Sequence, residues 1–514
     1  VSLSVKALVN HRSHHGRQGD WQPAITCIPN GLHVGEDMYL IGEGEAAETV
    51  PASAWYRGYF LARESYRGLD PLDDHLYAGR FQIHLKAGES WTLTASTSPE
   101  AGLHVHDALE RRQRHERSLL WQSGMEDAPE RVRHLVLASD QFLVKRAVQN
   151  NPDGHSIIAG YPWFADWGRD TMIALPGLTL AAGRIHTAGS ILQTFAGFLD
   201  KGMLPNNLPE RGEPPGADDY NTVDAALWFL EAVRAWFEAS RDTGLLRKLY
   251  PGMKEIIHWY KQGTRYDIGV DPVDSLLSSG EPGIQLTWMD AKVGEWVVTP
   301  RTGKAVEINA LWYNGLRIVQ KAALILGEPE QAQRCRIMAD RVQGSFNRFW
   351  NEERGFCFDV LDTPAGNDAS LRPNQLLAVS LHHSPLDRDK QCAVVDACAR
   401  SLLTSHGLRS LAPDDPAYLG HYGGNQHHRD SAYHQGTVWA WLTGPFVSAH
   451  LRVYGDHSAA RSFLEPLLDH VSGGCTGSLS EIFDGDPPFT PRGAFAQAWS
   501  VAEVLRAWKE TEQG

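Results

Sequence analysis

The sequence predicts a mainly α-helical fold: an (α/α)6 barrel, in which helical hairpins close into a toroid, preceded by an antiparallel β-sandwich-like domain. Two observations indicate it. Apolar residues alternate with polar ones up to about residue 105, and the apolar period is about 3.6 from there onward. Roughly twelve expected helices follow one another in pairs, and alternate connections between them are long. An open α-solenoid is the alternative, but no repeat of fixed length supports it.

The N-terminal β domain is expected over residues 1–105. Its segments VSLSVKALVN, RFQIHLKAG and WTLTAST alternate in polarity, with turns expected at residues 29–31 and 87–90. Its first strands have no obvious partners. Because the chain begins at Val1 inside such a strand, we expect a fragment or a processed chain. A charged helical connector is expected over residues 106–128, and the barrel over 129–514.

The long connections of the helical region are expected to form one functional face. They hold most of the unusual clusters of aromatic, acidic and amide side chains, and alternate loops of a ring of paired helices lie on the same rim. Segments that are apolar nearly all round, such as TVWAWLTGPFV, are expected in the inner layer of helices. The long connections are residues 151–168, 201–221, 264–306, 405–434 and 473–493.

Composition narrows the classes of function. The 514 residues carry a formal net charge of -14, which argues against nucleic acid and anionic membranes as partners. No apolar run is long enough to suggest a membrane span. The six cysteines are scattered without a CxxC pair, so we expect reduced thiols in a cytoplasmic protein.

The segment GYPWFADWGRDTMIALPGL, residues 160–178, is the first candidate for ligand binding. It concentrates Trp163, Trp167, Arg169 and Asp170 immediately before and at the start of a helix. Aromatic faces beside carboxylate and guanidinium groups suit a sugar, which presents C–H faces for stacking and hydroxyls for hydrogen bonds. The alternative is a helix entry in which Arg169 and Asp170 form a buried ion pair and the aromatic rings fill the core.

Two carboxyl groups are candidates for glycoside hydrolysis, which usually needs an acid and a base flanking the scissile bond. Asp290, in the apolar stretch TWMDA, suits an acid whose pKa is raised by its surroundings. Glu481, in SLSEIFDG, follows small polar residues that can orient an ionised base. Structural roles compete: a turn or N-cap for Asp290 and a first-turn helix charge for Glu481. Asp224 and Glu307 each open a helix, where capping is the competing role.

No metal, nucleotide or other cofactor is expected. The His pairs at residues 14–15 and 427–428 lack the spacing of a metal site. DGD at residues 484–486 lacks the ligand series of a calcium loop. No GxGxxG, GxxxxGK[ST] or GxSxG motif occurs in the sequence.

Several motifs together resemble the glucosidase domain of glycogen debranching enzymes, of the amylo-α-1,6-glucosidase type found in bacteria and archaea. They are GYPWFADWGRDTMIALPGL, NNLPERG, YNTVDAALWF, LTWMDAKVG, EINALWYN, RPNQ, YHQGTVW and SEIFDG. The N-terminal segments ALVNHRSHH, PNGL and WYRGYFLARESYRGLD are similar to the β domain of that family. WGRD is also similar to the corresponding segment of glucoamylases and trehalases, which share the (α/α)6 barrel.

The resemblance implies an inverting α-glucosidase that releases glucose from α-1,6 branch points of a glycogen-like α-glucan. It implies Asp290 as general acid and Glu481 as general base, with carboxyl groups roughly 6.5–9.5 Å apart. The eukaryotic enzymes also carry a transferase domain, for which this chain has no length. The substrate-binding residues that the resemblance implies are Trp163, Trp167, Arg169, Asp170, Asn207, Asp224, Trp288, Trp312, His434 and Gln435.

Three alternatives remain open. A trehalase or an α-1,4-glucoamylase-like enzyme would use nearly the same chemistry at the rim. A sugar epimerase on the same barrel would use His residues as acid and base, whereas His427, His428 and His434 lie on one loop. A glycan-binding scaffold would keep the Trp and Arg residues and would not need Asp290 or Glu481.

Overall fold

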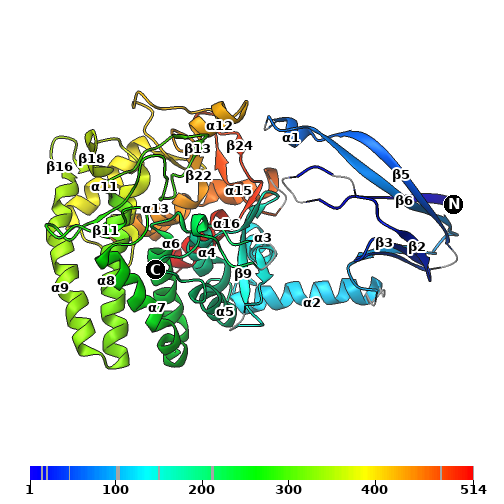
Figure 1. Ribbon diagram of the computed structural model, residues 1–514, viewed down its shortest axis with the longest axis horizontal. Coiled ribbons are helices and arrows are strands. Elements are labelled where there is room, and N and C mark those ends of the chain that lie inside the picture. Colours follow the sequence, from blue (N-terminus) through cyan, green and yellow to red (C-terminus); the bar gives the residue numbers. More distant parts are fainter. Residues whose placement is uncertain are drawn as a thin grey trace. The chain divides into compact units, whose positions relative to one another are not determined.

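The computed structural model describes residues 1–12, 16–18, 21–44, 47–66, 68–99, 105–148, 151–209, 213–474 and 477–512 (Figure 1). The chain divides into two units, Val1–Ser118 and Leu119–Gly514. The division falls within helix α2 (Val105–Ser123), in the segment that the sequence predicts to be a charged connector.

Two antiparallel sheets form the first unit. One has the strand order β1 (Ser2–Val9), β6 (Leu72–His84), β5 (Glu48–Phe60), and the other β2 (Ile25–Ile28), β3 (Gly31–Val34), β4 (Met38–Gly44), β7 (Trp91–Ser96); helix α1 (Ala62–Tyr66) lies between β5 and β6 in the chain. Apolar side chains of both sheets share a core that includes Leu32 and Phe81. The expectation that the first strands lack partners is wrong, because β1 pairs with β6 along its length.

Six helices of the second unit contact one another in a closed cycle. Each packs against the next, and the last packs against the first. Five of them follow the five long connections named above, and α10 follows residues 347–376, so the N-terminal end of each meets a connecting segment. The six are α4 (Gly168–Leu175), α6 (Ala225–Ser240), α8 (Val306–Leu326), α10 (Leu377–Ser380), α13 (Thr443–Tyr454) and α16 (Ala498–Thr511).

Most of the remaining helices pack against a member of this cycle, and α15 packs against α3. Figure 1 shows α8 and α9 side by side as a hairpin, and α7 packs against α8 in the same way. The mainly helical class with a strand-rich N-terminal unit is therefore confirmed. These helices are α3 (Glu130–Gln141), α5 (Ile185–Ala196), α7 (Thr243–Gln262), α9 (Pro329–Phe346), α11 (Arg388–Ser401), α14 (His457–Ser462) and α15 (Glu465–Gly473).

Short strands tie the long connections together. Strands β20 (Leu403–Thr404), β21 (Gly407–Arg409), β22 (Val438–Trp439), β23 (Ile482–Phe483) and β24 (Pro491–Arg492) form one sheet, and β9 (His155–Tyr161) pairs with β8 (Leu143–Lys145), β10 (Phe164–Asp166) and β25 (Ala496–Gln497). Smaller sheets are β15 (Lys304–Ala305) with β18 (Val360–Thr363) and β19 (Gly366–Asp368), β11 (Gly269–Val270) with β12 (Leu277–Ser278), β13 (Lys292–Val293) with β14 (Trp296–Val297), and β16 (Trp350–Asn351) with β17 (Phe356–Cys357). Helical turns in the same connections are α12 (Gln426–Ala432), η1 (Pro176–Leu180), η2 (Ala217–Tyr220), η3 (Asn347–Phe349), η4 (Pro373–Leu376) and η5 (Ala440–Leu442).

The apolar composition of the segment TVWAWLTGPFV predicts a single helix, but the structure does not form one helix over this segment. Val438 and Trp439 are strand residues, paired with Phe483 and Ile482, and the helix proper begins at Thr443. The pairing partners are more than forty residues away in the chain, which is why periodicity within the segment does not reveal them.

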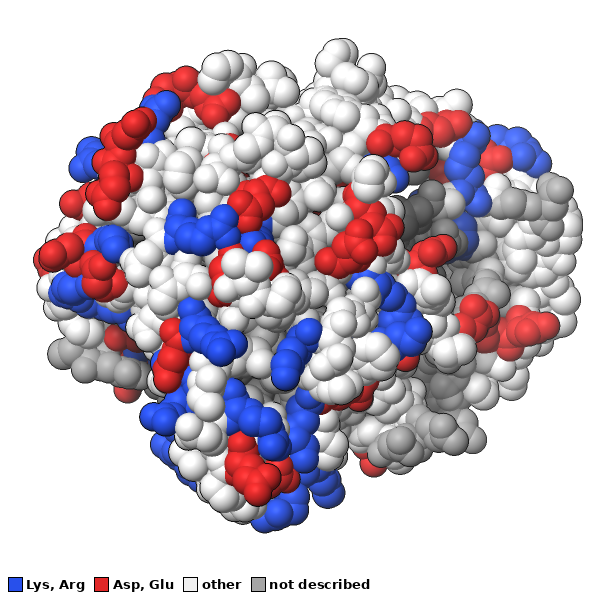
Figure 2. Space-filling model, turned by 60° about the vertical axis from the view of Figure 1, so that its left-hand side comes forward, with Lys and Arg blue, Asp and Glu red and all other residues white. Residues whose placement is uncertain are grey.

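The structure bears on three predictions from composition, which concern the surface charge, membrane spans and the cysteines. Lys and Arg side chains are interspersed with Asp and Glu on the face shown in Figure 2. No helix within the described ranges is both long and apolar enough to cross a membrane. The five described cysteines are free thiols, as expected, and Cys475 lies outside the described residues.

Candidate active site

The segment around WFADWGRD enters the helical unit as a hairpin followed directly by α4. Arg146 holds this hairpin in place, because its guanidinium donates two hydrogen bonds to Asp166, at 2.5 and 3.0 Å. Trp163 is buried, whereas Trp167 is half-buried and lies edge-on to Phe164 at a centroid distance of 6.4 Å. Part of the Trp167 side chain therefore remains accessible to a ligand.

Arg169, in the first turn of α4, joins two carboxylates from different loops. Its Nε donates to both oxygens of Asp224 at 2.8 Å, and its Nη1 donates to Asp290 Oδ2 at 2.9 Å. The structural alternative for this segment holds in part, because α4 begins at Gly168 and Trp163, Arg169 and Asp170 are buried, but the expected ion pair and the expected cap do not form. Arg169 pairs with Asp224 and Asp290 instead of with Asp170, and Asp224 makes no capping hydrogen bond at the start of α6.

Asp170 is a buried carboxyl group close to two others. Burial is the main cause that raises the pKa of Asp170 to about 7. The positive charge of Arg169 opposes this rise, whereas the negative charges of Asp290 and Glu481 add to it, because they disfavour ionisation of Asp170. The electrostatic influence also shows that Asp170, Asp290 and Glu481 are brought into one neighbourhood. Asp170 lies in the first turn of α4, whereas Asp290 and Glu481 come from two different long connections of the chain.

Asp170→Asn should make the free energy of unfolding less dependent on pH. The folded-state pKa of about 7 lies above the ordinary 3.8, so the folded chain holds this proton more tightly, and the associated stability is lost as pH rises through 7. Between pH 5 and pH 8 the wild type should lose at most about 3 kcal/mol that the variant keeps. Urea unfolding at both pH values measures the difference. Equal pH dependence in the two proteins would contradict a protonated Asp170 below pH 7.

Asp290 lies in the connection before β13 and is the accessible member of the Arg169 pair. Its side chain is 28 % exposed, whereas that of Arg169 is 2 % exposed. Burial raises the pKa of Asp290, and Asp224 adds to the rise, while Arg169 opposes it. A partly exposed carboxyl group whose pKa is raised suits the role of a general acid, because it holds its proton more tightly than an ordinary carboxyl group and can still reach a ligand.

Glu481, just before β23, is held in one orientation by two hydrogen bonds. The Tyr433 hydroxyl donates to Oε1, and the backbone N–H of Ala494 donates to Oε2 at 2.7 Å. Gly493 makes this approach possible: it has a φ of +64°, and a Cβ there would lie 2.2 Å from Oε2. Donors on both oxygens favour the ionised form that a base requires.

Three consecutive residues, Tyr433, His434 and Gln435, connect the loops that carry the two carboxyl groups. Tyr433 contacts Glu481, and the Nδ1 atom of His434 accepts from the backbone N–H of Ala291, next to Asp290, at 3.4 Å. Gln435 donates to Val298 and Thr299 and accepts from Arg372 at 2.8 Å. Burial holds the pKa of His434 well below its usual value, so its ring is neutral and can accept this bond.

Several residues predicted to bind substrate lie within the protein. Trp288 is 3 % exposed, donates to Asn374 Oδ1 at 2.7 Å, and contacts His434, Trp439 and Trp441 edge-on. Trp312 is fully buried in α8 beside Tyr260. Asn207 is half-buried and pairs through its backbone with Trp167. These positions suit residues that support the site better than residues that contact a ligand.

A buried network of ion pairs and hydrogen bonds contacts Trp288, and the sequence does not predict it. Asn374, which accepts from Trp288, donates to Asp359 at 2.8 Å. Arg301 pairs with both Asp359 and Glu307, and burial raises the pKa of Glu307 to about 7. Glu307 therefore pairs inside the protein and does not simply cap α8. The RPNQ motif signals Asn374, but no local pattern signals its partners.

Comparison with known proteins agrees with these motifs. A family model described as amylo-alpha-1,6-glucosidase matches residues 137–506, and one described as glycogen debranching enzyme N terminal matches residues 1–92. The glycogen debranching enzyme of Saccharomyces cerevisiae is 26% identical over 391 residues, which are 57% of this chain and 25% of the yeast protein. The chain thus spans about a quarter of the length of that relative.

Solved structures share the fold at lower identity. An uncharacterized conserved protein from Thermus thermophilus superposes with a TM-score of 0.53 at 16% identity, covering 73% of this chain and 99% of its own. The mannosylglycerate hydrolase of the same organism, from glycoside hydrolase family 63, gives 0.53 at 15% identity, with 74% and 99% covered. The matched family model covers well over half of the sequence, so the chain belongs to the amylo-alpha-1,6-glucosidase family of glycogen debranching enzymes, a family of glycoside hydrolases.

Proposed function

We propose that this chain is an inverting α-glucosidase that removes glucose from α-1,6 branch points of glycogen-like α-glucans, and that its helical unit is an (α/α)6 barrel. The closed cycle of six helices supports the barrel. The observation that carries the proposed reaction is that adjacent residues, Tyr433 and His434, contact Glu481 and the residue after Asp290. One segment thereby fixes an acid and a base together, which a two-carboxyl mechanism needs.

In the proposed reaction Asp290 protonates the glycosidic oxygen as the bond from that oxygen to C1 breaks. Glu481 takes a proton from a water molecule, whose oxygen bonds to C1 from the opposite face of the ring, so the glucose leaves as the β-anomer. Arg169 lies 2.9 Å from Asp290 and stabilises the carboxylate that remains after proton donation. Asp290 then takes up a proton from solvent, which its partly exposed side chain can reach, and this completes the cycle.

The sugar ring is proposed to lie between Asp170 and the accessible face of Trp167. Asp170 offers carboxyl oxygens to the glucose hydroxyls, and Trp163, in the turn between β9 and β10, is buried. The predicted residues Asp224, Trp288, Trp312, His434 and Gln435 would position this site from inside the protein, and Asn207 would hold Trp167. The neutral, engaged His434 also disfavours the epimerase alternative, since it has no proton to donate as an imidazolium.

A substrate panel tests the proposed specificity. Initial rates would be compared for a maltooligosaccharide with a single α-1,6-glucosyl branch, a linear maltooligosaccharide, trehalose and mannosylglycerate. We expect the branched compound to have the highest kcat/KM. A higher kcat/KM for trehalose or for the linear chain would move the protein to the trehalase or glucoamylase-like alternative. Binding of the branched compound without any hydrolysis would favour a glycan-binding scaffold.

Tyr433→Phe should lower kcat about 10- to 100-fold with little change in KM, because a hydrogen bond to a charged group contributes about 1.5–3 kcal/mol. The acid limb of the kcat/KM profile should also move to higher pH, since the Glu481 carboxylate loses a donor. Tyr454→Phe is a matched control, because the Tyr454 hydroxyl contacts Asp396 at the surface. An unchanged kcat and pH profile in Tyr433→Phe would exclude Tyr433 as a positioning residue.

A further inference from the structure

Two inner helices carry the same eight-residue motif, E-x-x-R-A-W-x-E. It reads EAVRAWFE in α6 and EVLRAWKE in α16. Residues three and four apart lie on the same face of a helix, so the Arg and both Glu side chains of each copy project together. In α6, Arg234 donates to Glu231 at 2.9 Å and to Glu238 at 2.5 Å. The motif in α6 thus holds one guanidinium group between two carboxylates.

The second copy repeats this arrangement and ties it to α13. Arg506 donates to Glu503 and to Glu510, both at 2.6 Å, and Ser448 of α13 donates to Glu510 at 2.6 Å. Gly444 lets the two helices approach, because a Cβ there would lie 2.1 Å from Glu503 Oε2. The carboxylates raise the pKa of Arg506 despite its burial, so the guanidinium stays charged.

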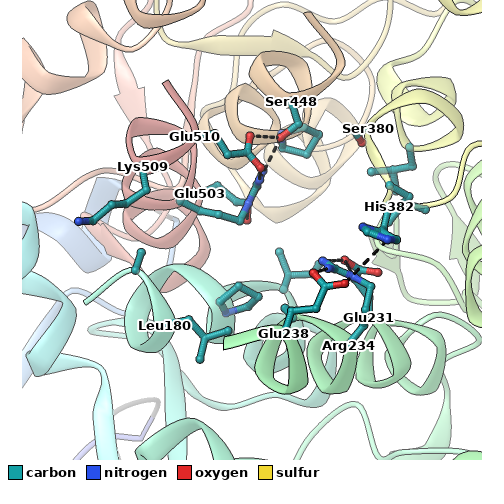
Figure 3. Close-up of a pocket in the computed structure, with 18 of the residues that line it drawn as sticks. Leu180, Glu231, Arg234, Glu238, Ser380, His382, Ser448, Glu503, Lys509 and Glu510 are labelled. Carbon is teal, nitrogen blue, oxygen red and sulfur yellow. Dashed lines mark hydrogen bonds and ion pairs between the residues drawn. The ribbon is translucent and has the colours of Figure 1, made fainter. Parts of the chain in front are cut away.

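The two motifs lie on opposite sides of a cavity of about 700 Å³ (Figure 3). Glu231, Arg234 and Glu238 lie on one side, and Glu503 and Glu510 lie on the other. Arg234 and Arg506 are close enough to influence one another electrostatically.

This cavity is distinct from the candidate active site. Residues of α4, α6, α10, α13 and α16 line it, and the two Arg–Glu motifs lie in the middle and C-terminal turns of α6 and α16, whereas the proposed acid and base precede α8 and α16 at their N-terminal ends. Neither Asp290 nor Glu481 lines it, nor do Asp170 and Arg169. Trp441, which lines the cavity, lies edge-on to Trp288 at 5.4 Å, so a layer of indole rings separates the two sites.

The charges that line the cavity balance, which limits the ligand it can take. Four Glu side chains face three Arg and one Lys. An added anion would lie beside four carboxylates and an added cation beside the guanidinium groups, and either would leave charge uncompensated in a partly buried space. Hydroxyl groups both donate and accept, so they can bond to carboxylate and guanidinium groups without changing the charge balance.

We propose that this cavity is a second binding site, which takes a neutral polyhydroxylated molecule with the size of one or two sugar rings. Its volume falls in the range of small-molecule sites, roughly 300–1,000 Å³. Pro176, Leu180 and Leu451 line the cavity and are partly exposed, so they supply apolar surface for the C–H faces of such a ligand, and the two Arg–Glu motifs supply paired donors and acceptors. The proposal does not depend on which glycoside the active site cleaves.

The test is ¹⁹F NMR of the full chain labelled with 5-fluorotryptophan, in an Asp290→Asn background so that no sugar is consumed. Trp228, identified by its loss in Trp228→Phe, reports on the cavity. Titration with glucose or maltose should shift the Trp228 resonance to saturation, and the shift should persist in Asp170→Asn. Inorganic phosphate and putrescine, the charged probes, should produce no saturable shift.

Filling the cavity provides the decisive comparison. Ala235→Phe places a ring in the cavity and should abolish the sugar-dependent shift, whereas Ala108→Phe, on an exposed face of α2, should not. If Ala235→Phe lacks a cooperative melting transition, Ala239→Phe at the exposed edge of the cavity replaces it. An identical shift in the filled variant, no response to either sugar, or a saturable response to phosphate or putrescine that filling removes would each overturn the proposal.

Discussion

Asp290→Asn should lower kcat by about 10²- to 10⁴-fold while leaving substrate affinity nearly unchanged, because loss of a general acid affects the transition state. The side chain keeps its shape and can still contact Arg169, whose ion pair with Asp224 remains. The loss should be smallest for substrates whose leaving group needs no proton, such as an aryl α-glucoside with an acidic phenol. Steady-state kinetics on the branched oligosaccharide and on such an aryl glucoside measure both effects.

The matched control for this change is Asp340→Asn. Asp340 also pairs with an Arg side chain, at 2.7 Å, but its own side chain is 54 % exposed on α9. We expect wild-type kinetics in the control, since exposed ion pairs contribute little. A near-normal kcat in Asp290→Asn, or an equal loss on both leaving groups, would remove Asp290 from the role of acid.

Glu481→Ala should lower kcat by a comparable factor, about 10²- to 10⁴-fold, because water is then no longer activated. Azide should restore part of the activity. The shortened side chain leaves room on the base side, the azide nitrogen bonds to C1 as the C1–oxygen bond breaks, and Asp290 still protonates the leaving group. Attack from the base side gives β-glucosyl azide, which NMR identifies directly.

The control for this second change is Glu330→Ala, at a side chain that is 90 % exposed. It should have wild-type kinetics and no response to azide. Formation of α-glucosyl azide would place the nucleophile on the other face of the sugar and contradict Glu481 as the base of an inverting enzyme. Unimpaired hydrolysis in Glu481→Ala would also contradict it.

The sequence predicts the architecture where the signal is local. Alternation in segments such as VSLSVKALVN yields the strands of the first unit, and the 3.6-residue period yields the helices of the second. It fails where a distant pairing overrides local pattern. Trp439 belongs to an apolar helix-like segment, yet it forms a strand with Ile482, and β1 finds its partner in β6 about seventy residues later.

The candidate site divides in the same way. Motifs alone single out Asp290, Glu481 and Arg169, and the structure brings these residues together, but their roles stay proposals. Tyr433 lies in the same motif as His434 and was still missed, because nothing local shows that its hydroxyl reaches Glu481. The partners of Arg169 were missed for the same reason: which carboxylates reach one guanidinium depends on where three distant loops meet.

The repeated E-x-x-R-A-W-x-E motif can be seen in the sequence, but its meaning depends on the fold. Its two copies are visible in the sequence, in EAVRAWFE and EVLRAWKE, but they lie more than 250 residues apart. Their relation becomes meaningful only when the closed cycle places α6 and α16 on either side of α4. Repetition in the sequence therefore indicates a cavity only together with the fold.

The most direct test of the proposed inverting mechanism is proton NMR of the glucose released in the first minutes from a maltooligosaccharide with one α-1,6-glucosyl branch. The anomeric protons distinguish α- from β-glucose before mutarotation equilibrates them. β-Glucose appearing first is the predicted result, because water activated by Glu481 attacks opposite the bond that Asp290 protonates. α-Glucose appearing first would mean retention of configuration and would contradict the assignment of these two residues as acid and base.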